Sequence, residues 1–257
     1  MRIVDGNEST VSHLLGIERL EQAIDDRRGQ EIRTTPTRST WSFALADGST
    51  AFRKHRRGRR ADARAEWKWL GSLAAAGFRV PGRLLLLEQD TRSVVVMRAV
   101  PGRPLSEWIL AAVETADARS RLRTYLVGPV AACVRRLHDA GFVHRDLYWN
   151  HLFAEEIGEH RPEPAIIDVE RVIRPTWIRR RRWLVKDLGA LLGSWPAATL
   201  PRTLALRFLR SYSGGRLAPG WKRIARAVVR RAWRIRTHRP RYGSPPIWWE
   251  GDKVRSP

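Results

Sequence analysis

The sequence has little cysteine and lysine, and it contains no long apolar run. Cys133 is the single cysteine of the 257 residues, which excludes a disulfide scaffold and is typical of a reducing compartment. Its place on an apolar helix face predicts a buried thiol rather than a nucleophile. No apolar run approaches the ~18 residues of a membrane span, and the opening MRIVDGNEST lacks the order of a signal peptide. We therefore expect a cytoplasmic protein, either soluble or attached to a surface.

The charge is strongly one-sided. Lysine and arginine total 48 against 26 aspartates and glutamates, a net charge of +22, and only five of the basic residues are lysines. Such a surface attracts polyanions, so nucleic acid, anionic lipid and a phosphorylated substrate are all candidates. The arginine excess is also what a GC-rich genome produces. Because arginine fills almost every basic position, each lysine marks a place where chemistry favours an amine.

Hydrophobic patterning divides the chain near residues 97–104. Residues 1–36 contain an amphipathic stretch at 11–28 followed by the loop-like TTPTRST, and we take them as an N-terminal helical extension. Residues 37–100 read as β-β-α-β-β, and residues 101–257 are mainly helical. The expected fold class is α+β, with a small β-rich lobe and a larger helical lobe.

Within the helical part, Ser106 is a candidate cap for a helix that runs to about residue 115. Residues 118–140 predict one longer helix, and residues 184–194 and 202–238 predict further helical stretches.

The strongest chemical motif is VHRDLYWNHLF, at residues 143–153. Phosphoryl-transfer enzymes of the protein-kinase type use H-R-D-x-x-x-x-N, in which the aspartate takes or orients the acceptor hydroxyl and the last residue holds a metal ion. Asp146 and His151 occupy these two positions here, with histidine in place of asparagine. The His-Arg-Asp triplet is weak evidence alone, so the surrounding sequence must carry the argument.

Three further residues supply that context. Asp168 follows the apolar PAII, where a kinase places its metal-binding aspartate. TWSFALA and STAFRKH, separated by Asp47-Gly48, predict a β-hairpin. Lys54 lies on its second strand, where an amine holds the nucleotide phosphates, and Glu66 lies early in the next helix, where it can pair with Lys54. Each residue taken alone has a plain alternative as a solvated surface group. Their order along the chain favours a phosphotransferase site.

At this point the chain resembles a known family. HRDLYWNHLF, the following IIDVER and the later RRRRWLVKDLGALLGSW are similar to the lipopolysaccharide core kinases, the Kdo and heptose kinases that include the WaaP-type enzymes. The resemblance covers roughly residues 38–212. It implies a protein-kinase-like two-lobe fold, ATP with Mg²⁺ as cofactors, and phosphorylation of a sugar hydroxyl of a lipid-linked anionic glycan. It also implies a protein that is cytoplasmic and peripheral on the inner membrane.

The resemblance also implies roles for individual residues. Asp146 matches the catalytic aspartate, Lys54 the nucleotide-binding lysine, Asp168 the metal-binding aspartate and His151 the second metal position. Asp187 matches a buried aspartate that holds the catalytic loop.

Two features depart from the usual kinase pattern. No glycine-rich loop precedes Lys54, so Ser39 and Thr40 are candidates for replacing it near the nucleotide phosphates. A histidine ligand at position 151 favours Mn²⁺ more than an oxygen ligand does; alternatively, His151 supports the loop and Asn150 turns inward.

Two basic segments bear on the partner. Residues 174–182 carry five arginines around Pro175 and Trp177, and residues 221–236 have the pattern of an interfacial helix or of a packed helix with a basic outer side. Either segment suits an anionic membrane surface. We expect nucleic acid not to be the partner, and the sequence leaves the oligomeric state open.

Two other functions compete with the core kinase hypothesis. One is a kinase-like enzyme for another small molecule or for protein. The other is an inactive kinase fold that serves as a basic binding module for membrane or nucleic acid, although such a module has no reason to retain Lys54, Asp146 and Asp168 together.

Overall fold

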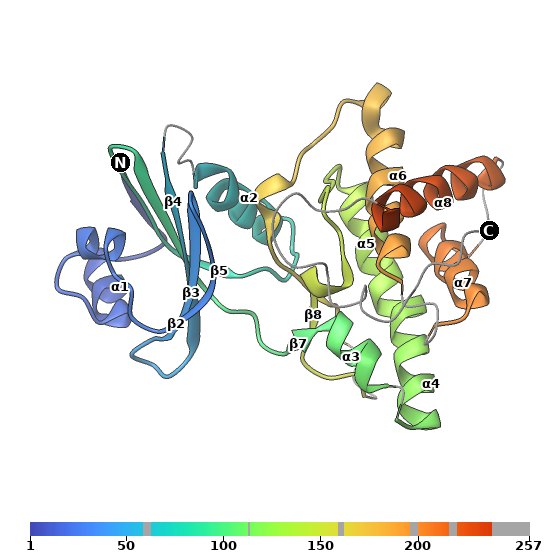
Figure 1. Cartoon of the computed structure of the whole chain (residues 1–257), viewed down its shortest axis with the longest axis horizontal. Coiled ribbons are helices and arrows are strands. Elements are labelled where there is room, and N and C mark those ends of the chain that lie inside the picture. The colour runs from blue at the N-terminus through green and yellow to red at the C-terminus, as the bar shows by residue number, and fades with distance from the viewer. Residues whose placement is uncertain (59–62, 113, 159–161, 196–199, 216–219, 238–257) are drawn as a thin grey trace. The chain divides into compact units, whose positions relative to one another are not determined.

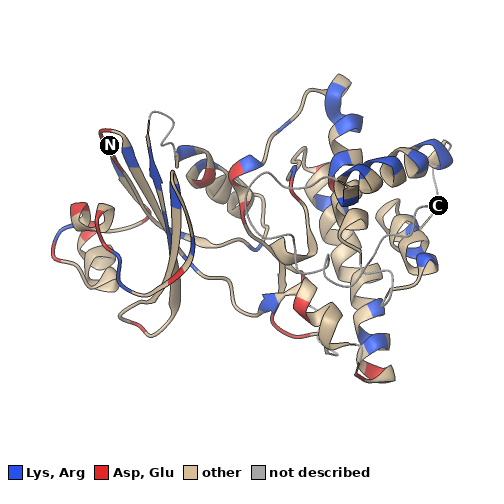
Figure 2. Cartoon of the chain, viewed as in Figure 1, with Lys and Arg blue, Asp and Glu red and all other residues tan. Residues whose placement is uncertain are grey.

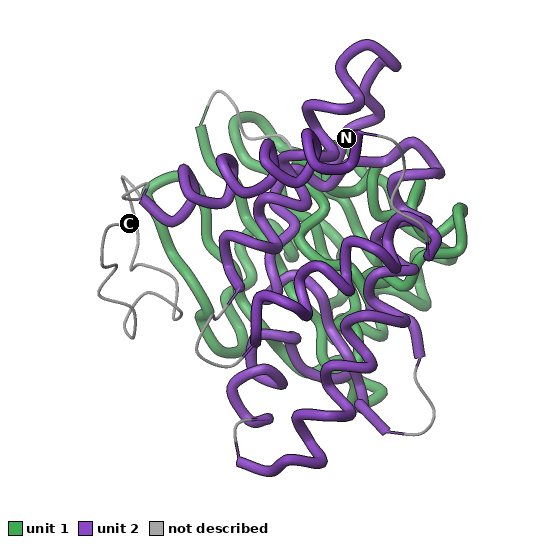
Figure 3. Tube along the Cα trace, turned by 90° about the vertical axis from the view of Figure 1, so that its right-hand side faces the viewer, with its two compact units in different colours: residues 1–101, 165–171 green, residues 102–164, 172–257 purple. Residues whose placement is uncertain are grey.

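The structure is a computed structural model that describes residues 1–58, 63–112, 114–158, 162–195, 200–215 and 220–237. It contains two compact units, which Figure 3 colours separately. Unit 1 consists of residues 1–101 and 165–171, and unit 2 of residues 102–164 and 172–257. Unit 1 therefore takes in a short segment from the middle of the part that the sequence pattern assigns to helices.

Unit 1 is built on a six-stranded antiparallel sheet with the order β1-β5-β6-β4-β3-β2 (Figure 1). Its strands are β1 (Arg2–Val4), β2 (Gln30–Thr35), β3 (Arg38–Ala44), β4 (Thr50–Arg57), β5 (Gly82–Gln89) and β6 (Arg92–Arg98). The helix α2 (Arg64–Ala75) connects β4 to β5. The β-β-α-β-β pattern that the sequence predicts for residues 37–100 is confirmed in β3, β4, α2, β5 and β6.

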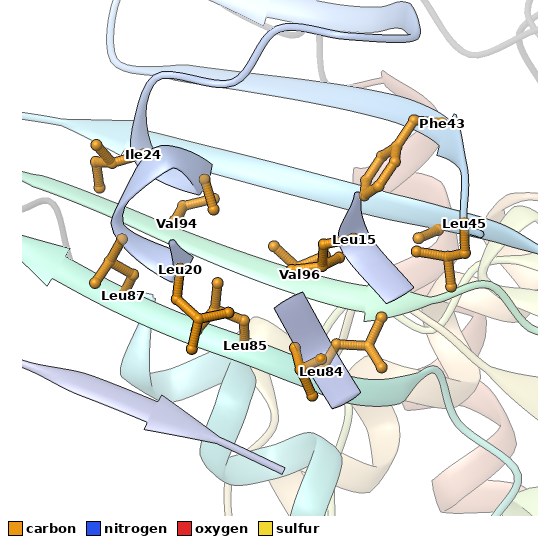
Figure 4. Close-up of a cluster of buried hydrophobic side chains, with 13 residues drawn as sticks. Leu15, Leu20, Ile24, Phe43, Leu45, Leu84, Leu85, Leu87, Val94 and Val96 are labelled. Carbon is orange, nitrogen blue, oxygen red and sulfur yellow. The ribbon is translucent and has the colours of Figure 1, made fainter. Parts of the chain in front are cut away.

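The two faces of this sheet are covered differently. On one face, helix α1 (Glu8–Leu15) and the 3₁₀ helix η1 (Leu20–Ile24) pack on β5 and β6 through a cluster of buried aliphatic side chains that includes Leu15, Leu20, Leu85 and Val96 (Figure 4). Helix α2 lies on the opposite face (Figure 1). β5 and β6 carry near-continuous apolar runs because both of their faces are buried.

Two predictions for the N-terminal stretch are wrong. Residues 11–28 are not one helix, because α1 ends at Gly16, whose φ of 62° lies in the left-handed region that closes helices. The TTPTRST stretch is not a loop but parts of β2 and β3, which pair through Thr34 and Ser39 around the turn at residues 36 and 37. Ile32 is the single apolar residue of β2, and it is exposed, so the period-two apolar signal of a strand is missing.

Unit 2 is mainly helical. Its elements are β7 (Arg103–Pro104), α3 (Leu105–Ala111), α4 (Ala116–Tyr125), the π-helical η2 (Leu126–Val130), α5 (Ala131–Asp139), the 3₁₀ helix η3 (Trp149–His151), β8 (Leu152–Ala154), α6 (Trp177–Gly193), α7 (Arg202–Tyr212) and α8 (Trp221–Thr237). The remaining two elements, β9 (Ala165–Ile166) and the 3₁₀ helix η4 (Val169–Arg171), belong to unit 1.

Three helical predictions need correction. Pro104 is the residue at the N-cap of α3, so Ser106 lies inside the helix instead of capping it. The predicted helix 118–140 forms as α4, η2 and α5, and its π-helical turn contains Pro129, which has no N–H to donate in a regular turn. The stretch 202–238 forms two helices, α7 and α8, and α6 begins at Trp177 rather than at residue 184.

Helix α8 packs along α6. A Cβ at Gly189 would lie 2.6 Å from Arg231 Cγ, so this glycine allows the two helices to approach closely. Val228 and Ala232 of α8 are buried, whereas its arginines 223, 226, 230 and 234 are exposed. Of the two alternatives for this segment, the packed helix with a basic outer side is therefore the one that the structure contains. In the described part of the chain, no helix has the length and apolar character to cross a membrane.

Candidate active site

Lys54 lies between two carboxylates in unit 1. Its Nζ is 2.6 Å from Glu66 Oε1 and 3.0 Å from Asp168 Oδ1. Burial alone lowers the pKa of this amine, but the two carboxylates outweigh burial and hold the pKa of Lys54 above its usual range. The ammonium is thus charged at physiological pH. The structure brings together three of the residues that the sequence analysis names, from β4, from α2 and from the segment after β9.

Local structure explains how these three residues meet. Lys54 lies on the face of β4 opposite the one that carries Arg53 and His55, because side chains alternate along a strand. Glu66 is in the first turn of α2 and is 1% exposed, so its negative charge requires a cation nearby. Asp168 has a φ of 56°, a left-handed conformation that is uncommon outside glycine and that recurs at functional sites.

A second ion pair that the sequence analysis missed lies beside the first. Arg56, two residues beyond Lys54 on β4, donates through both terminal nitrogens to Glu170, at 3.1 and 2.6 Å. Its Nη2 is also 3.5 Å from Glu66 Oε2. Arg38 reaches Glu170 at 3.4 Å. The sequence held a signal for this second pair. Arg56 lies two residues after Lys54 on β4, and Glu170 lies two residues after Asp168 in DVER.

The His-Arg-Asp motif lies in unit 2, where Asp187 of α6 holds its backbone. The Asp187 carboxylate accepts hydrogen bonds from the backbone amides of His144 and Arg145, both at 2.7 Å, and lies 3.2 Å from His138 Nε2. Asp187 is fully buried. Arg145 has a φ of 74°, so these two amide bonds hold a backbone conformation that arginine rarely adopts. Removing the carboxylate would leave buried N–H groups unsatisfied, at ~1–3 kcal/mol each.

Asp146 and His151 are joined within this loop. His151 Nδ1 lies 2.7 Å from the main-chain oxygen of Asp146, and because a carbonyl only accepts, Nδ1 carries the proton. The lone pair of a neutral ring is then on Nε2, the tautomer that a metal-binding histidine adopts when a carbonyl orients it. Asn150 has its side-chain oxygen buried without a hydrogen-bond partner in the described part of the chain.

Lys186 lies beside Asp146, a contact that the sequence analysis did not predict, although it quoted this lysine within the family motif. Lys186 Nζ of α6 lies 3.6 Å from Asp146 Oδ1, and both side chains are largely buried. Trp183, one turn earlier on α6, lies beneath Arg145, whose guanidinium carbon is 5.0 Å from the ring centre. Lys186 and Asp187 are neighbours on one helix, so α6 positions both the backbone and the carboxylate of the motif.

The described residues contain no group of three or more histidine, cysteine and acidic side chains that could by itself hold a metal ion. Mg²⁺ in phosphoryl-transfer sites is bound by one or two protein ligands, with phosphate oxygens and water as the others. The Asp168 carboxylate, 44% exposed, and the oriented imidazole of His151 are donors of the expected kind.

The expectation for Cys133 is confirmed, since this residue is fully buried. His138 lies in the core, where it contacts Asp187 and Tyr212. The turn between β2 and β3 contains no glycine. The Thr35 hydroxyl spans it and donates a hydrogen bond to the Arg38 carbonyl at 3.2 Å.

Two features define a phosphotransferase of the kinase-like fold. Lys54 is held between the carboxylates of Glu66 and Asp168, and the buried Asp187 supports the backbone of a His-Arg-Asp loop. The comparisons agree. A family model described as the lipopolysaccharide kinase (Kdo/WaaP) family matches residues 52–212, more than half of the sequence, and the chain belongs to this family. It is therefore a kinase of the lipopolysaccharide core with an alcohol group as acceptor, as the resemblance predicts.

Solved structures support the fold class. A structure of WaaP in complex with acyl carrier protein is 25% identical, with a TM-score of 0.71, over 91% of this chain and 99% of that chain. An aminoglycoside phosphotransferase, APH(3'')-Id from Streptomyces rimosus in complex with ADP and streptomycin, is 16% identical, with a TM-score of 0.55, over 81% and 95% of the two chains. A comparison with curated protein sequences gives no match. The predicted kinase-like α+β fold is confirmed.

Proposed function

We propose that the protein transfers the γ-phosphoryl group of ATP to a sugar hydroxyl of the lipopolysaccharide inner core, on Kdo or heptose, at the cytoplasmic face of the inner membrane. Lys54, held at 2.6 Å from Glu66 and 3.0 Å from Asp168, is the observation that carries this proposal. A lysine that is kept charged and fixed in direction by two carboxylates is suited to nucleotide phosphates.

Each residue has a distinct part in the proposed reaction. Lys54 contacts the α- and β-phosphates, and Glu66 fixes its direction. Asp146 accepts a hydrogen bond from the acceptor hydroxyl, orients it in line with the γ-phosphorus and takes its proton as the new P–O bond forms. The bond from the γ-phosphorus to the bridging oxygen breaks in the same step, and ADP leaves. Asp187 keeps Asp146 in place through the backbone amides of His144 and Arg145.

Asp168 and His151 are the proposed ligands of the divalent ion. Mg²⁺ bound there would neutralise charge on the β- and γ-phosphate oxygens. The carboxylate of Asp168 suits Mg²⁺, whereas an imidazole nitrogen at the second position suits Mn²⁺ as well. The hydrogen bond from His151 Nδ1 to the Asp146 carbonyl places the lone pair of a neutral ring on Nε2, as the proposed ligand role requires.

Membrane contact is proposed for the start of α6. Trp177 and Ile178 are 83% and 73% exposed, and residues 179–182 directly after them are all arginines. Figure 2 shows basic residues along α6 and α8. Exposed aromatic and aliphatic side chains beside arginines are the pattern of an interfacial anchor. Helix α8 packs on α6 through a buried face that includes Val228 and Ala232. Its exposed side adds arginines 223, 226, 230 and 234 to the proposed contact, together with the exposed Val229 and Trp233.

The rival functions remain distinguishable by experiment. A kinase for another small molecule would show the same nucleotide site, and an inactive fold would bind without turnover. We therefore propose mass spectrometry of lipid A-core from cells with the gene, without it, and complemented by wild type or by Asp146→Asn. We expect one phosphate to be missing without the gene and to return with wild type only. An unchanged phosphate count in the deletion would rule out the inner-core acceptor.

Purified protein tests the chemistry independently. Asp146→Asn should lower kcat by ~10²–10⁴ while nucleotide affinity stays nearly intact, because the carboxylate acts on the acceptor. Near-normal turnover by this variant would remove Asp146 from the proposed role.

Vesicle binding tests the membrane contact. Binding to phosphatidylglycerol vesicles should exceed binding to neutral ones and weaken with salt. A double variant, Trp177→Ser with Ile178→Ser, should lose most of this binding, whereas Leu206→Ser, at the 53% exposed Leu206 of α7, should lose little. Equal loss in both variants, or equal binding to neutral vesicles, would contradict an anchor at the start of α6.

A further inference from the structure

Unit 1 contains a small cavity between β2, β3 and β4 at the end of the face that α1 and η1 cover. Its volume is about 200 Å³. We call it the β2–β4 pocket. Its lining includes Arg27, Thr34, Arg38, Ser39, Trp41 and Arg57.

Most of the polar lining of the β2–β4 pocket lies on the opposite side of the sheet from Lys54. Arg57 and His55 are on the same face of β4, one residue out of phase with Lys54. Ser39 pairs with His55 across the sheet and so shares its face, whereas Thr40 pairs with Lys54. Ser39, Trp41 and Arg57 therefore lie on the face away from Lys54, whereas Arg38, which pairs with Arg56, lies on the Lys54 face.

Two buried donors in the lining have no partner. Ser39 is 8% exposed, and within the described residues its Oγ has no hydrogen-bond partner; the same is true of Trp41 Nε1. Buried polar atoms are satisfied in more than about nine cases in ten, so an orphaned hydroxyl and an orphaned indole N–H in one pocket point to an absent acceptor. The Ser39 hydroxyl reorients by rotation about its side-chain bonds.

The charge of the lining is positive. Arg27, Arg38 and Arg57 supply three guanidinium groups, and Glu31 is the acidic residue among the lining side chains. Arg38 also contacts Glu170, so Arg27 and Arg57 carry most of the uncompensated charge. The acids next to Arg27 are engaged with other arginines: Asp25 pairs with Arg92, and Asp26 pairs with Arg28 and Arg53.

The pKa values of Arg27 and His55 are both lowered, in part by neighbouring arginines. The pKa of Arg27 is lowered, first by burial and then by Arg57, although Asp25 and Asp26 oppose the shift. Burial, Arg27 and Arg53 lower the pKa of His55 to about 3, so this histidine is neutral. A bound anion would relieve the repulsion between Arg27 and Arg57.

We propose that the β2–β4 pocket binds a phosphate group. Guanidinium groups bind phosphate oxygens in pairs of hydrogen bonds, and hydroxyl and indole donors add neutral ones. The volume is below the ~300 Å³ at which pockets for drug-sized ligands begin, so the site takes a phosphoryl head with its carrier outside, and not a whole nucleotide. The site is independent of the proposed transfer reaction.

The test is calorimetric titration of the purified full chain with inorganic phosphate at low salt. Ser39→Ala should weaken binding about 5- to 10-fold, since it removes one donor to a charged group. Arg57→Gln should weaken it about 10-fold or more. The matched control is Arg207→Gln, at an exposed arginine of α7, and the titration is repeated on wild type in saturating ADP to occupy the proposed nucleotide side; both should stay within about twofold of wild type.

The outcomes separate binding in the β2–β4 pocket from binding elsewhere on the protein. No binding by wild type would overturn the proposal, as would loss of binding in saturating ADP, which would place the phosphate on the nucleotide side. Equal losses of phosphate affinity in Arg207→Gln and Arg57→Gln would show that binding depends on the overall positive charge of the protein, and would also overturn the proposal. Because Arg57 is exposed, its variant remains informative even if Ser39→Ala disturbs folding.

Further titrations identify the carrier of the phosphate. Glucosamine 1-phosphate binding more tightly than inorganic phosphate, with the same loss in Arg57→Gln, would support the proposal with a sugar phosphate as ligand. Phosphatidic acid vesicles that bind wild type better than Arg57→Gln, and better than phosphatidylcholine vesicles, would support it with a lipid headgroup. Binding of inorganic phosphate alone would support it with free phosphate.

Discussion

Lys186 Nζ lies 3.6 Å from Asp146 Oδ1, so the carboxylate proposed to act on the acceptor has an ammonium from helix α6 beside it. Both side chains are mostly shielded from solvent, at 16% and 18% exposure, which strengthens their interaction relative to a surface pair. Lys54 and Lys186 are two of only five lysines in the chain, and each pairs with an aspartate of the proposed site.

The first prediction concerns this positioning cation. Lys186→Met should lower kcat by about 10- to 100-fold, because Asp146 loses its partner and the transferred phosphoryl loses a nearby positive charge. Nucleotide KM should change little. Lys222→Met, at an exposed position of α8, is the control and should retain full turnover. A change in KM alone would show that Lys186 serves binding and does not position Asp146.

The second prediction concerns the amine at Lys54. A compact ammonium fits between Glu66 and Asp168, whereas the broader guanidinium of Lys54→Arg should misplace the nucleotide and remove most activity. The matched control is Lys68→Arg, at an exposed position of α2. Turnover of both variants is measured at saturating ATP, and full activity in both would leave Lys54 as a structural residue of β4.

The third prediction concerns the divalent ion. If the imidazole of His151 is a ligand, His151→Asn replaces nitrogen by oxygen and should shift the preference from Mn²⁺ toward Mg²⁺. The measurement is the ratio of kcat with the two ions. Asp168→Ala should abolish turnover with either ion. An unchanged ratio in His151→Asn would place this side chain outside the coordination sphere and favour a loop-supporting role.

The fourth prediction uses Cys133 as a probe of packing in unit 2. Burial, and secondarily Glu163, raises the pKa of this thiol well above its usual range, so the reactive thiolate is suppressed at pH 8. A thiol reagent such as DTNB should therefore react slowly with the native protein and fast in denaturant. Stoichiometric reaction within seconds under native conditions would mean that α5 is not packed as described.

Much of the fold was readable from local patterns. The strands β3 to β6 and helix α2 were predictable because apolar residues recur there at the period of a strand or a helix. β2 was not predictable, because Ile32 is its single apolar residue and it is held in the sheet by its hydrogen-bonded pairing with β3. The break between α1 and η1 depends on Gly16, which becomes a helix end only in the left-handed conformation.

The sequence by itself indicated the class of chemistry. Residue type, order and spacing single out Lys54, Glu66, Asp146 and Asp168 as the proposed site, because phosphoryl transfer requires such groups in a limited set of positions. The tertiary structure decided which groups surround them. The pairing of Arg56 with Glu170, of Lys186 with Asp146, and of Asp187 with the backbone of His144 joins residues far apart in sequence. Buried charges need partners in space, and only packing determines which cation or amide reaches each carboxylate.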